Sequence, residues 1–172
     1  MIRKATHDDI PAIVAMQRAV AEEGSVHGYC PDTAEEWACR DLAWTFVAVA
    51  DERPCGFVCC MPREYAGESV LPVHSRTLEI ADLVVAASHR GQGIGHELVL
   101  AAKRHARQQG FSHLRVYSAA KRFDDVVRFY RSSGFVPWYL EMTQEIERPN
   151  QDVRIGEVAD PTDLERPGEQ GG

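Results

Sequence analysis

The stretch Arg90-Gly91-Gln92-Gly93-Ile94-Gly95 joins an apolar run at residues 80–87 to an amphipathic helical pattern at about 94–109. Glycine has no Cβ and adopts positive φ without strain, so alternating glycines let the backbone pass close to a ligand. The first turn of the following helix presents unpaired N–H groups and the positive end of the helix dipole at the same place. A strand, a glycine turn and a helix in this order are typical of a pyrophosphate site.

The spacing of these glycines argues against two other nucleotide-binding turns. A P-loop requires Gly-x-x-x-x-Gly-Lys followed by Ser or Thr, and the stretch does not fit that pattern. A dinucleotide-binding turn requires Gly-x-Gly-x-x-Gly, and here the position of the third glycine is His96. The acidic residue that would bind a ribose about twenty positions further on is also missing from the sequence.

The rest of the chain predicts a mixed α/β layer fold, with the order β-α-α-β-β-β-α-β-α-β and helices on both faces of the sheet. Apolar and β-branched runs indicate strands, and apolar residues at helical spacing indicate helices. The expected strands are residues 2–5, 45–50, 55–61, 77–85, 111–117 and 135–144, and the expected helices are 7–22, 33–42, 94–109 and 121–133. Residues 62–76 are expected to form a long loop.

The first expected helix has a recognisable beginning and a recognisable buried face. Thr6 is the expected N-cap, and Asp9 stands three positions later, where a capping box has its acid. The residues at helical spacing, which should face the core, are Ile10, Ile13, Val14, Met16, Gln17 and Val20.

Length and composition indicate one globular domain at residues 1–146 and a tail at residues 147–172. The chain of 172 residues is 44% hydrophobic and 26% charged, as in ordinary soluble proteins. The last segment is rich in proline, glycine and acidic residues and contains no aromatic residue. We therefore expect it to bury little surface and to be flexible.

Net charge and cysteine content limit the classes of partner and the cellular compartment that we expect for this protein. The net charge of −7 argues against sequence-independent nucleic-acid binding, which requires a basic surface, and no apolar run approaches the length that crosses a membrane. The odd number of cysteines and the lack of an apolar leader after Met1 favour a reduced, cytoplasmic protein with free thiols. A metal site is not expected, because the adjacent Cys59 and Cys60 point to opposite faces of their strand.

Two motifs together resemble those of a known family. Arg90-x-x-Gly93-x-Gly95 resembles the acyl-CoA pyrophosphate loop of the GNAT superfamily of N-acetyltransferases, and the apolar Leu83-Val84-Val85 precedes it as in that family. About forty residues later, Phe129-Tyr130-Arg131-Ser132-Ser133-Gly134-Phe135 resembles the second GNAT signature, Phe-Tyr-x-x-x-Gly-Phe. By element order the resemblance covers residues 1 to about 145.

The resemblance implies an enzyme that moves an acetyl group from acetyl-CoA to a primary amine of a small molecule or a protein, without a metal. It implies that the backbone of Leu83, Val84 and Val85 holds the pantetheine amides and polarises the thioester carbonyl. The implied pyrophosphate site consists of Arg90, Gly91, Gln92, Gly93, Ile94 and Gly95. The family often has Asn six residues before the Phe of the second motif; here that position is Phe123, and Ser118 or Asp124 is the expected replacement.

Amine acetylation also needs a base for the amine and an acid for the departing thiolate. By resemblance, Tyr130 is the candidate acid; on spacing alone it would be a core aromatic residue. Glu79 is the favoured base and Asp82 the second candidate, and either carboxylate could instead be an ordinary surface charge. Alternation along the strand puts these two residues on opposite faces unless a bulge lies between them. His74 is a further candidate from the preceding loop.

The acceptor half of the reaction stays open. Acidic residues at 22, 23, 32, 35 and 36 are compatible with a cationic amine or with a solvent-facing surface. Two alternatives to the enzyme are a non-catalytic acyl-CoA-binding regulatory module and a GNAT toxin that acetylates aminoacyl-tRNA. Because members of the family are often dimers, a homodimer is possible.

Overall fold

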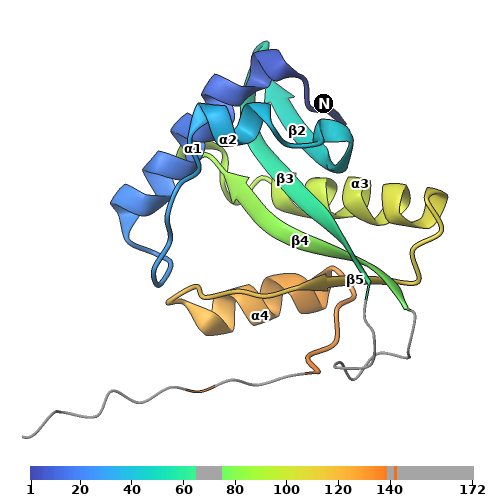
Figure 1. The fold of residues 1–172 in the computed structure, drawn as a ribbon. Coiled ribbons are helices and arrows are strands. Elements are labelled where there is room, and N and C mark those ends of the chain that lie inside the picture. Colours follow the sequence, from blue (N-terminus) through green and yellow to red (C-terminus); the bar gives the residue numbers. More distant parts are fainter. Residues whose placement is uncertain (65–74, 139–141, 143–172) are drawn as a thin grey trace, which may run out of the picture. The chain divides into compact units, whose positions relative to one another are not determined.

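A five-stranded sheet with the order β1-β2-β3-β4-β5 forms the centre of the structure (Figure 1). In this computed structural model, residues 1–64, 75–138 and 142 are described. The strands are β1 (Ile2–Lys4), β2 (Thr45–Ala50), β3 (Arg53–Glu64), β4 (Arg76–Val85) and β5 (His113–Val116). The first four strands are antiparallel, whereas β4 and β5 are parallel, because a helical crossover joins them.

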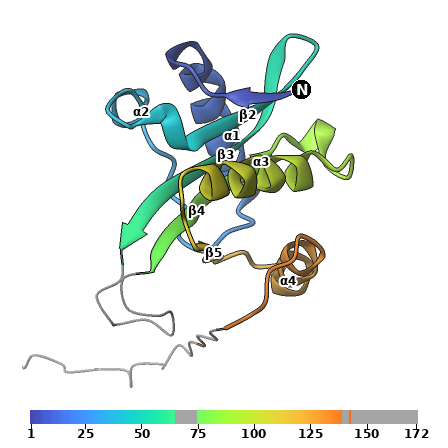
Figure 2. The same cartoon turned by 90° about the vertical axis from the view of Figure 1, so that its right-hand side faces the viewer.

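Helices cover both faces of this sheet (Figures 1 and 2). The α-helices are α1 (Ile10–Glu23), α2 (Ala34–Ala38), α3 (Ile94–Gln108) and α4 (Phe123–Ser132), and short 3₁₀ turns are η1 (His7–Asp9), η2 (Leu42–Trp44) and η3 (Ala87–His89). The helices α1 and α2 pack on one face and α3 on the other. The predicted α/β fold with helices on both faces is therefore confirmed. None of the described helices is long and apolar enough to cross a membrane.

Each face of the sheet has its own hydrophobic core, and β3 contributes to both. Phe57 and Cys59 join Ile13 of α1 and Trp37 of α2 in the first core. The intervening residues of β3 point the other way, and Val58 packs in the second core under α3. This is the alternation expected of a central strand with both faces buried, and it places the adjacent Cys59 and Cys60 on opposite sides as predicted.

Several element boundaries differ from those predicted. The predicted loop 62–76 is shorter, because β3 continues to Glu64 and β4 begins at Arg76, and these ends pair with each other. The second helix ends at Ala38, and Asp41 caps a separate turn, η2. Residues 135–138 form no strand, and most of the remaining predicted strand lies outside the described residues. The predicted tail at 147–172 also lies outside them.

Candidate active site

Among the described residues, the end of β4 pairs with another strand along one of its two edges. Thr77 to Ile80 pair with β5, but β5 ends there, and Leu83 to Val85 pair only with β3. The backbone of these three residues thus faces the open side of a splayed strand pair. The resemblance assigns the pantetheine amides to the backbone of these three residues, and an unpaired strand edge leaves backbone groups available for that role.

The glycine turn follows this open edge directly. Gly91 and Gly93 have φ of +76° and +82°, a left-handed conformation that only glycine adopts readily, and Gly93 is the N-cap of α3. The guanidinium of Arg90 donates to the carbonyl oxygen of Val85 and to the carboxylate of Glu23, both at 2.9 Å. Arg90 therefore ties the turn to β4 and to the end of α1.

Gly95 allows α3 to approach α4 closely. A Cβ on Gly95 would lie 3.1 Å from the Cε2 atom of Phe129. The ring of Phe129 in turn contacts His96 and Tyr130, with ring centroids 4.6 Å and 5.0 Å away. The two motifs, about forty residues apart in sequence, therefore meet at the beginning of α3.

Tyr130 lies on the α3 side of the sheet, next to the open edge of β4. Its ring packs edge-on against Phe129 and Phe135, and its hydroxyl forms no hydrogen bond with any of the described residues. Burial raises the pKa of Tyr130 above its usual value, and the nearby thiol of Cys60 and carboxylate of Asp82 raise it further. The hydroxyl is therefore protonated at neutral pH and free to donate.

A bulge in β4 decides the placement of the two candidate bases. Cys59 is paired with Asp82 and Cys60 with Ile80, so that Ala81 is the extra residue. The bulge shifts the alternation by one residue and puts Glu79 and Asp82 on the same face, the face covered by α1. The expectation of opposite faces, which held only without a bulge, is therefore wrong for this chain.

Glu79 is held by two cations. Arg63 donates to Oε1 of Glu79 from Nε and Nη2, both at 3.3 Å, and Nε of Arg115 lies 3.5 Å from Oε2. Both oxygens of the Glu79 carboxylate are therefore engaged with guanidinium groups from the neighbouring strands. The favoured base from sequence thus has the surroundings of a structural ion pair.

Asp82 has different surroundings. Nε2 of Gln17 donates to its Oδ2 at 2.7 Å, and the hydroxyl of Tyr29 donates at 3.2 Å, but no described cation contacts it directly. Burial raises the pKa of Asp82, and the hydrogen bonds from Gln17 and Tyr29 only partly oppose this effect. A half-buried carboxylate with a raised pKa has the properties of a general base.

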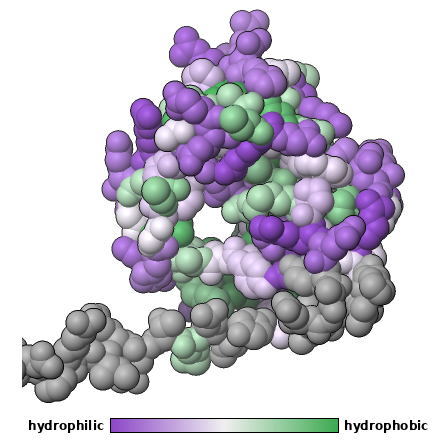
Figure 3. Space-filling model, in the orientation of Figure 1, coloured by the Kyte–Doolittle hydropathy of each residue, from purple (hydrophilic) through white to green (hydrophobic). Residues whose placement is uncertain are grey.

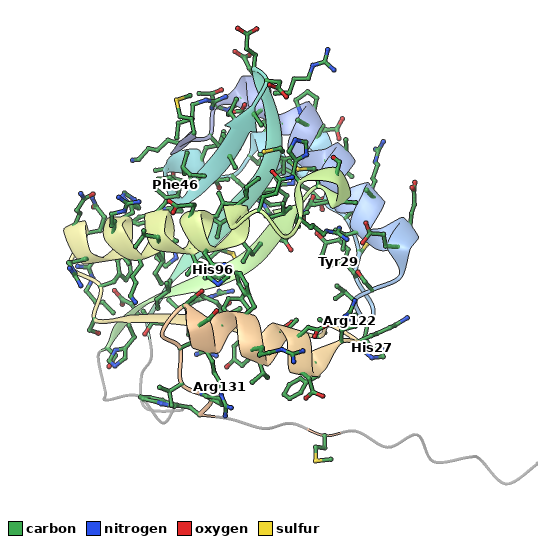
Figure 4. The ribbon with its side chains drawn as sticks, turned by 180° about the vertical axis from the view of Figure 1, so that it is seen from behind. His27, Tyr29, Phe46, His96, Arg122 and Arg131 are labelled. Atoms are coloured by element: carbon green, nitrogen blue, oxygen red, sulfur yellow. The ribbon has the colours of Figure 1, made fainter. Side chains whose placement is uncertain are left out.

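An opening passes through the described part of the chain beside these residues (Figure 3). It lies between the end of β4, α4 and the loop after α1, and Tyr29 lies at its rim in the view from behind (Figure 4). Two loops close it on one side, because His27 N donates to Ala119 O and Lys121 N donates to Ser25 O, both at 2.9 Å. Ser118 precedes this contact, and its hydroxyl accepts from the N–H of Ala120 at 3.3 Å.

The structure surrounds Asp82 and its hydrogen-bond partners with Gln17, Tyr29, Asp32 and Trp37. The sequence offers Asp32 only as one of several acidic residues compatible with a cationic acceptor, and it does not assign Gln17 or Tyr29 to the site. Gln17 carried a signal, because it is a polar residue at a position of the apolar face of α1. The candidate base His74 lies outside the described residues. Within residues 1–64 and 75–138, no group of three or more His, Cys, Asp or Glu side chains is placed to hold a metal ion.

Solved structures with this fold include several acetyltransferases. A variant of the BH1408 protein from Bacillus halodurans has a TM-score of 0.67 and 20% identity, over 86% of this chain and 99% of that chain. An aminoglycoside acetyltransferase, meta-AAC0020, from an uncultured soil metagenomic sample has a TM-score of 0.61 and 20% identity, over 86% and 96% of the two chains. The aminoglycoside N-acetyltransferase AAC(6')-Iy, in complex with CoA, has a TM-score of 0.63 and 16% identity, over 86% and 100%.

Sequence comparison identifies the family. No curated protein matches the chain. The model described as the acetyltransferase (GNAT) family matches residues 13–135, which include the glycine turn, the bulged strand and the Phe-Tyr motif. Since this match covers more than half of the chain and agrees with the fold, the chain belongs to the acetyltransferase (GNAT) family.

Proposed function

We propose that the protein is an N-acetyltransferase that moves an acetyl group from acetyl-CoA to a primary amine. The observation that supports this proposal most strongly is the arrangement around the open end of β4. The glycine turn and the N-terminus of α3 lie at the end of this strand, and Asp82 and Tyr130 lie on its two faces.

The donor half uses backbone groups. The N–H groups in the first turn of α3 and the turn at 90–95 bind the pyrophosphate of acetyl-CoA. The open edge of β4 at Leu83, Val84 and Val85 binds the pantetheine amides and polarises the thioester carbonyl. Ser118 follows β5, which ends at Val116, and its hydroxyl is offered to the pantetheine amides from that side.

The acid and base act from opposite faces of the splayed strand. Asp82 accepts a proton from the acceptor ammonium and later releases it to solvent. The neutral amine attacks the thioester carbonyl, and the tetrahedral intermediate collapses as Tyr130 donates its proton to the departing sulfur. The amide nitrogen then loses its remaining extra proton, which restores the hydroxyl of Tyr130 through solvent. Because the same dry surroundings raise the pKa of a thiol and of a phenol, the two groups stay matched for this transfer.

The acceptor is a primary amine that reaches Asp82 through the opening beside Tyr29. Two of the similar folds are named as aminoglycoside acetyltransferases, and one of them was solved in complex with sisomicin. Aminoglycosides therefore belong in a panel of acceptors beside polyamines, simple alkylamines and peptide amines. We also propose that the protein works in the cytoplasm, where its free thiols stay reduced.

The test is release of free CoA thiol from acetyl-CoA in the presence of each amine of the panel. With an accepted amine, Asp82→Asn and Tyr130→Phe should each lower kcat about 100-fold, because each variant removes one proton transfer. Glu79→Gln is the matched control on the same strand, and it should leave kcat close to that of the unmodified protein. A loss of kcat of about 100-fold in Glu79→Gln, with kcat unchanged in Asp82→Asn, would contradict the assignment of the base.

Two other outcomes would favour the alternative functions. Tight acetyl-CoA binding without thiol release on any amine would indicate a regulatory module. Salt-sensitive binding of aminoacyl-tRNA, with acetylation of its amino acid, would indicate a toxin. A CoA complex with the pyrophosphate anywhere other than at residues 90–95 would contradict the donor site itself.

A further inference from the structure

Gln17 connects Asp82 to the helices that cover its face of the sheet. The side chain is 1% exposed and lies on the buried side of α1. Its Nε2 donates to Oδ2 of Asp82 at 2.7 Å and to Oδ2 of Asp32 at 2.9 Å. Its Oε1 accepts from the indole Nε1 of Trp37 at 2.9 Å. Both polar atoms of this carboxamide, Nε2 and Oε1, thus form hydrogen bonds.

Trp37 decides which way the carboxamide of Gln17 points. An indole N–H can only donate, so the atom of Gln17 that faces it must be the oxygen, and the NH₂ group must face the two carboxylates. Trp37 itself is fully buried, with its ring edge-on to Phe57 at 5.7 Å and the guanidinium of Arg40 4.6 Å from its ring centroid. The orientation of Gln17 is therefore set by a side chain that is itself fixed by packing.

We propose that Gln17 is a positioning residue for acetyl transfer: oriented by Trp37, its carboxamide holds the carboxylate of Asp82 in place to accept the proton of the acceptor amine. This inference rests on the function proposed above. It adds a role for Gln17 and Trp37, which the glycine turn and the Phe-Tyr motif do not include. The hydroxyl of Tyr29, at the rim of the opening, donates to the same carboxylate.

The charged and titratable groups around Asp82 come from several elements. The carboxylate of Asp32 raises the pKa of Asp82, and the guanidinium of Arg40, which is paired with Asp32 at 2.6 Å, lowers it. The protonated hydroxyls of Tyr29 and Tyr130 and the thiol of Cys59 complete the surroundings. Among these neighbours, Gln17 makes the shortest hydrogen bond to the carboxylate.

These surroundings give the pH dependence a definite sign. The hydrogen bond from Gln17 favours the ionised form of Asp82 and so lowers its pKa. A base acts only when it is ionised, so kcat/KM falls as the pH falls through the pKa of Asp82. In Gln17→Leu the acid limb of the pH profile should move to higher pH. At pH values below the pKa of Asp82, kcat/KM should therefore be about tenfold lower than in the unmodified protein.

Asp32→Asn is the matched control, because it changes the other carboxylate on the same Gln17 nitrogen. It removes a negative charge that raises the pKa of Asp82, so it should move the acid limb to lower pH. Trp37→Phe keeps an aromatic ring in the core but removes the donor that orients Gln17. It should move the acid limb in the same direction as Gln17→Leu.

A readout without activity separates this inference from the proposed function. The ¹³Cγ resonance of Asp82, identified by its loss in Asp82→Asn, is titrated by NMR in the full chain. A higher titration midpoint in Gln17→Leu and in Trp37→Phe, with acetyl-CoA affinity and cooperative unfolding retained, supports the positioning role. An unchanged midpoint in both folded variants overturns it, whether or not an acceptor amine is known. Failure of every amine in the thiol-release assay overturns the proposed function instead.

Discussion

Two carboxylates in this protein, the buried Asp9 and the half-buried Asp82, have opposite pKa shifts because their neighbours differ. Asp9 is 3% exposed and accepts two hydrogen bonds from the guanidinium of Arg3, at 2.6 Å and 2.7 Å, and a third from Thr6 N at 2.8 Å. The hydrogen bonds from Arg3 hold the pKa of Asp9 below its usual value. Asp82 has hydrogen bonds but no cation in direct contact, and burial raises its pKa. The ion pair favours the charged form of Asp9, whereas the half-buried Asp82, without a cation in contact, has its neutral form favoured.

The first prediction concerns the stability contributed by Asp9. Asp9→Asn should lower the free energy of unfolding at pH 7 by about 2 kcal/mol, since it leaves the guanidinium of Arg3 without its partner. Because the pKa of Asp9 is lowered in the folded state, its contribution is present above the unfolded pKa of about 3.9 and is lost as the pH falls through the folded pKa. Urea unfolding at pH 7 and at progressively lower pH measures both effects.

The exposed neighbour Asp8 provides the control. Asp8→Asn should change the free energy of unfolding by less than about 0.5 kcal/mol. The difference in free energy of unfolding between Asp9→Asn and the unmodified protein should shrink at acid pH. A difference that stays constant would show that Asp9 does not stabilise the fold through its charge.

At the scale of an element, the helix α3 begins and ends at glycines in the left-handed conformation. Gly93, with φ of +82°, is the N-cap, and Gly110, with φ of +73°, follows the last turn. A Cβ at either position would strain the backbone to a similar degree. The two ends differ in function, because only the N-terminal end carries the proposed pyrophosphate site.

This difference predicts a separation of stability from binding. Gly93→Ala and Gly110→Ala should each lower the free energy of unfolding by about 1 kcal/mol. Gly93→Ala should also weaken acetyl-CoA binding about tenfold, because the strained turn misplaces N–H groups that bind phosphate oxygens. Isothermal titration calorimetry measures the affinity. Equal affinity for acetyl-CoA in the two variants would contradict the proposal that the glycine turn binds the pyrophosphate.

At the scale of the whole molecule, two hydrophobic cores share one sheet. Ile13 lies in the core under α1 and Leu98 in the core under α3, and both are fully buried. The strand β3 sends alternate side chains into each core, so neither core can lose its packing without affecting the shared strands. We therefore expect both layers to unfold in a single transition.

The corresponding prediction is a double-mutant cycle across the sheet. Ile13→Ala and Leu98→Ala should each lower the free energy of unfolding by about 3 kcal/mol. Their effects should add within about 0.5 kcal/mol, because the two side chains lie on opposite faces and share no core. Circular dichroism and tryptophan fluorescence should give coincident unfolding curves. Leu100→Ala, on the exposed side of α3, is the control and should lower the free energy of unfolding far less.

The local features of this protein follow from sequence because they depend on residues a few positions apart. Thr6 and Asp9 pair as a capping box, although they cap the 3₁₀ turn η1 and α1 itself begins only at Ile10, and the helix after the glycine turn is formed as predicted. The alternation that separates Cys59 from Cys60 also holds. In each case the backbone conformation is determined by neighbours along the chain, which a single sequence displays.

The amino-acid sequence alone indicated the α/β fold through the order of its apolar patterns, and it indicated the family through the spacing within two short motifs. Only the tertiary structure shows that the two candidate bases have different surroundings. The bulge at Ala81 depends on how β4 pairs with β3, and the cations on Glu79 come from two neighbouring strands. The contact of Gln17 with Asp82 joins residues 65 positions apart. Such contacts depend on packing between distant segments, which no local pattern specifies.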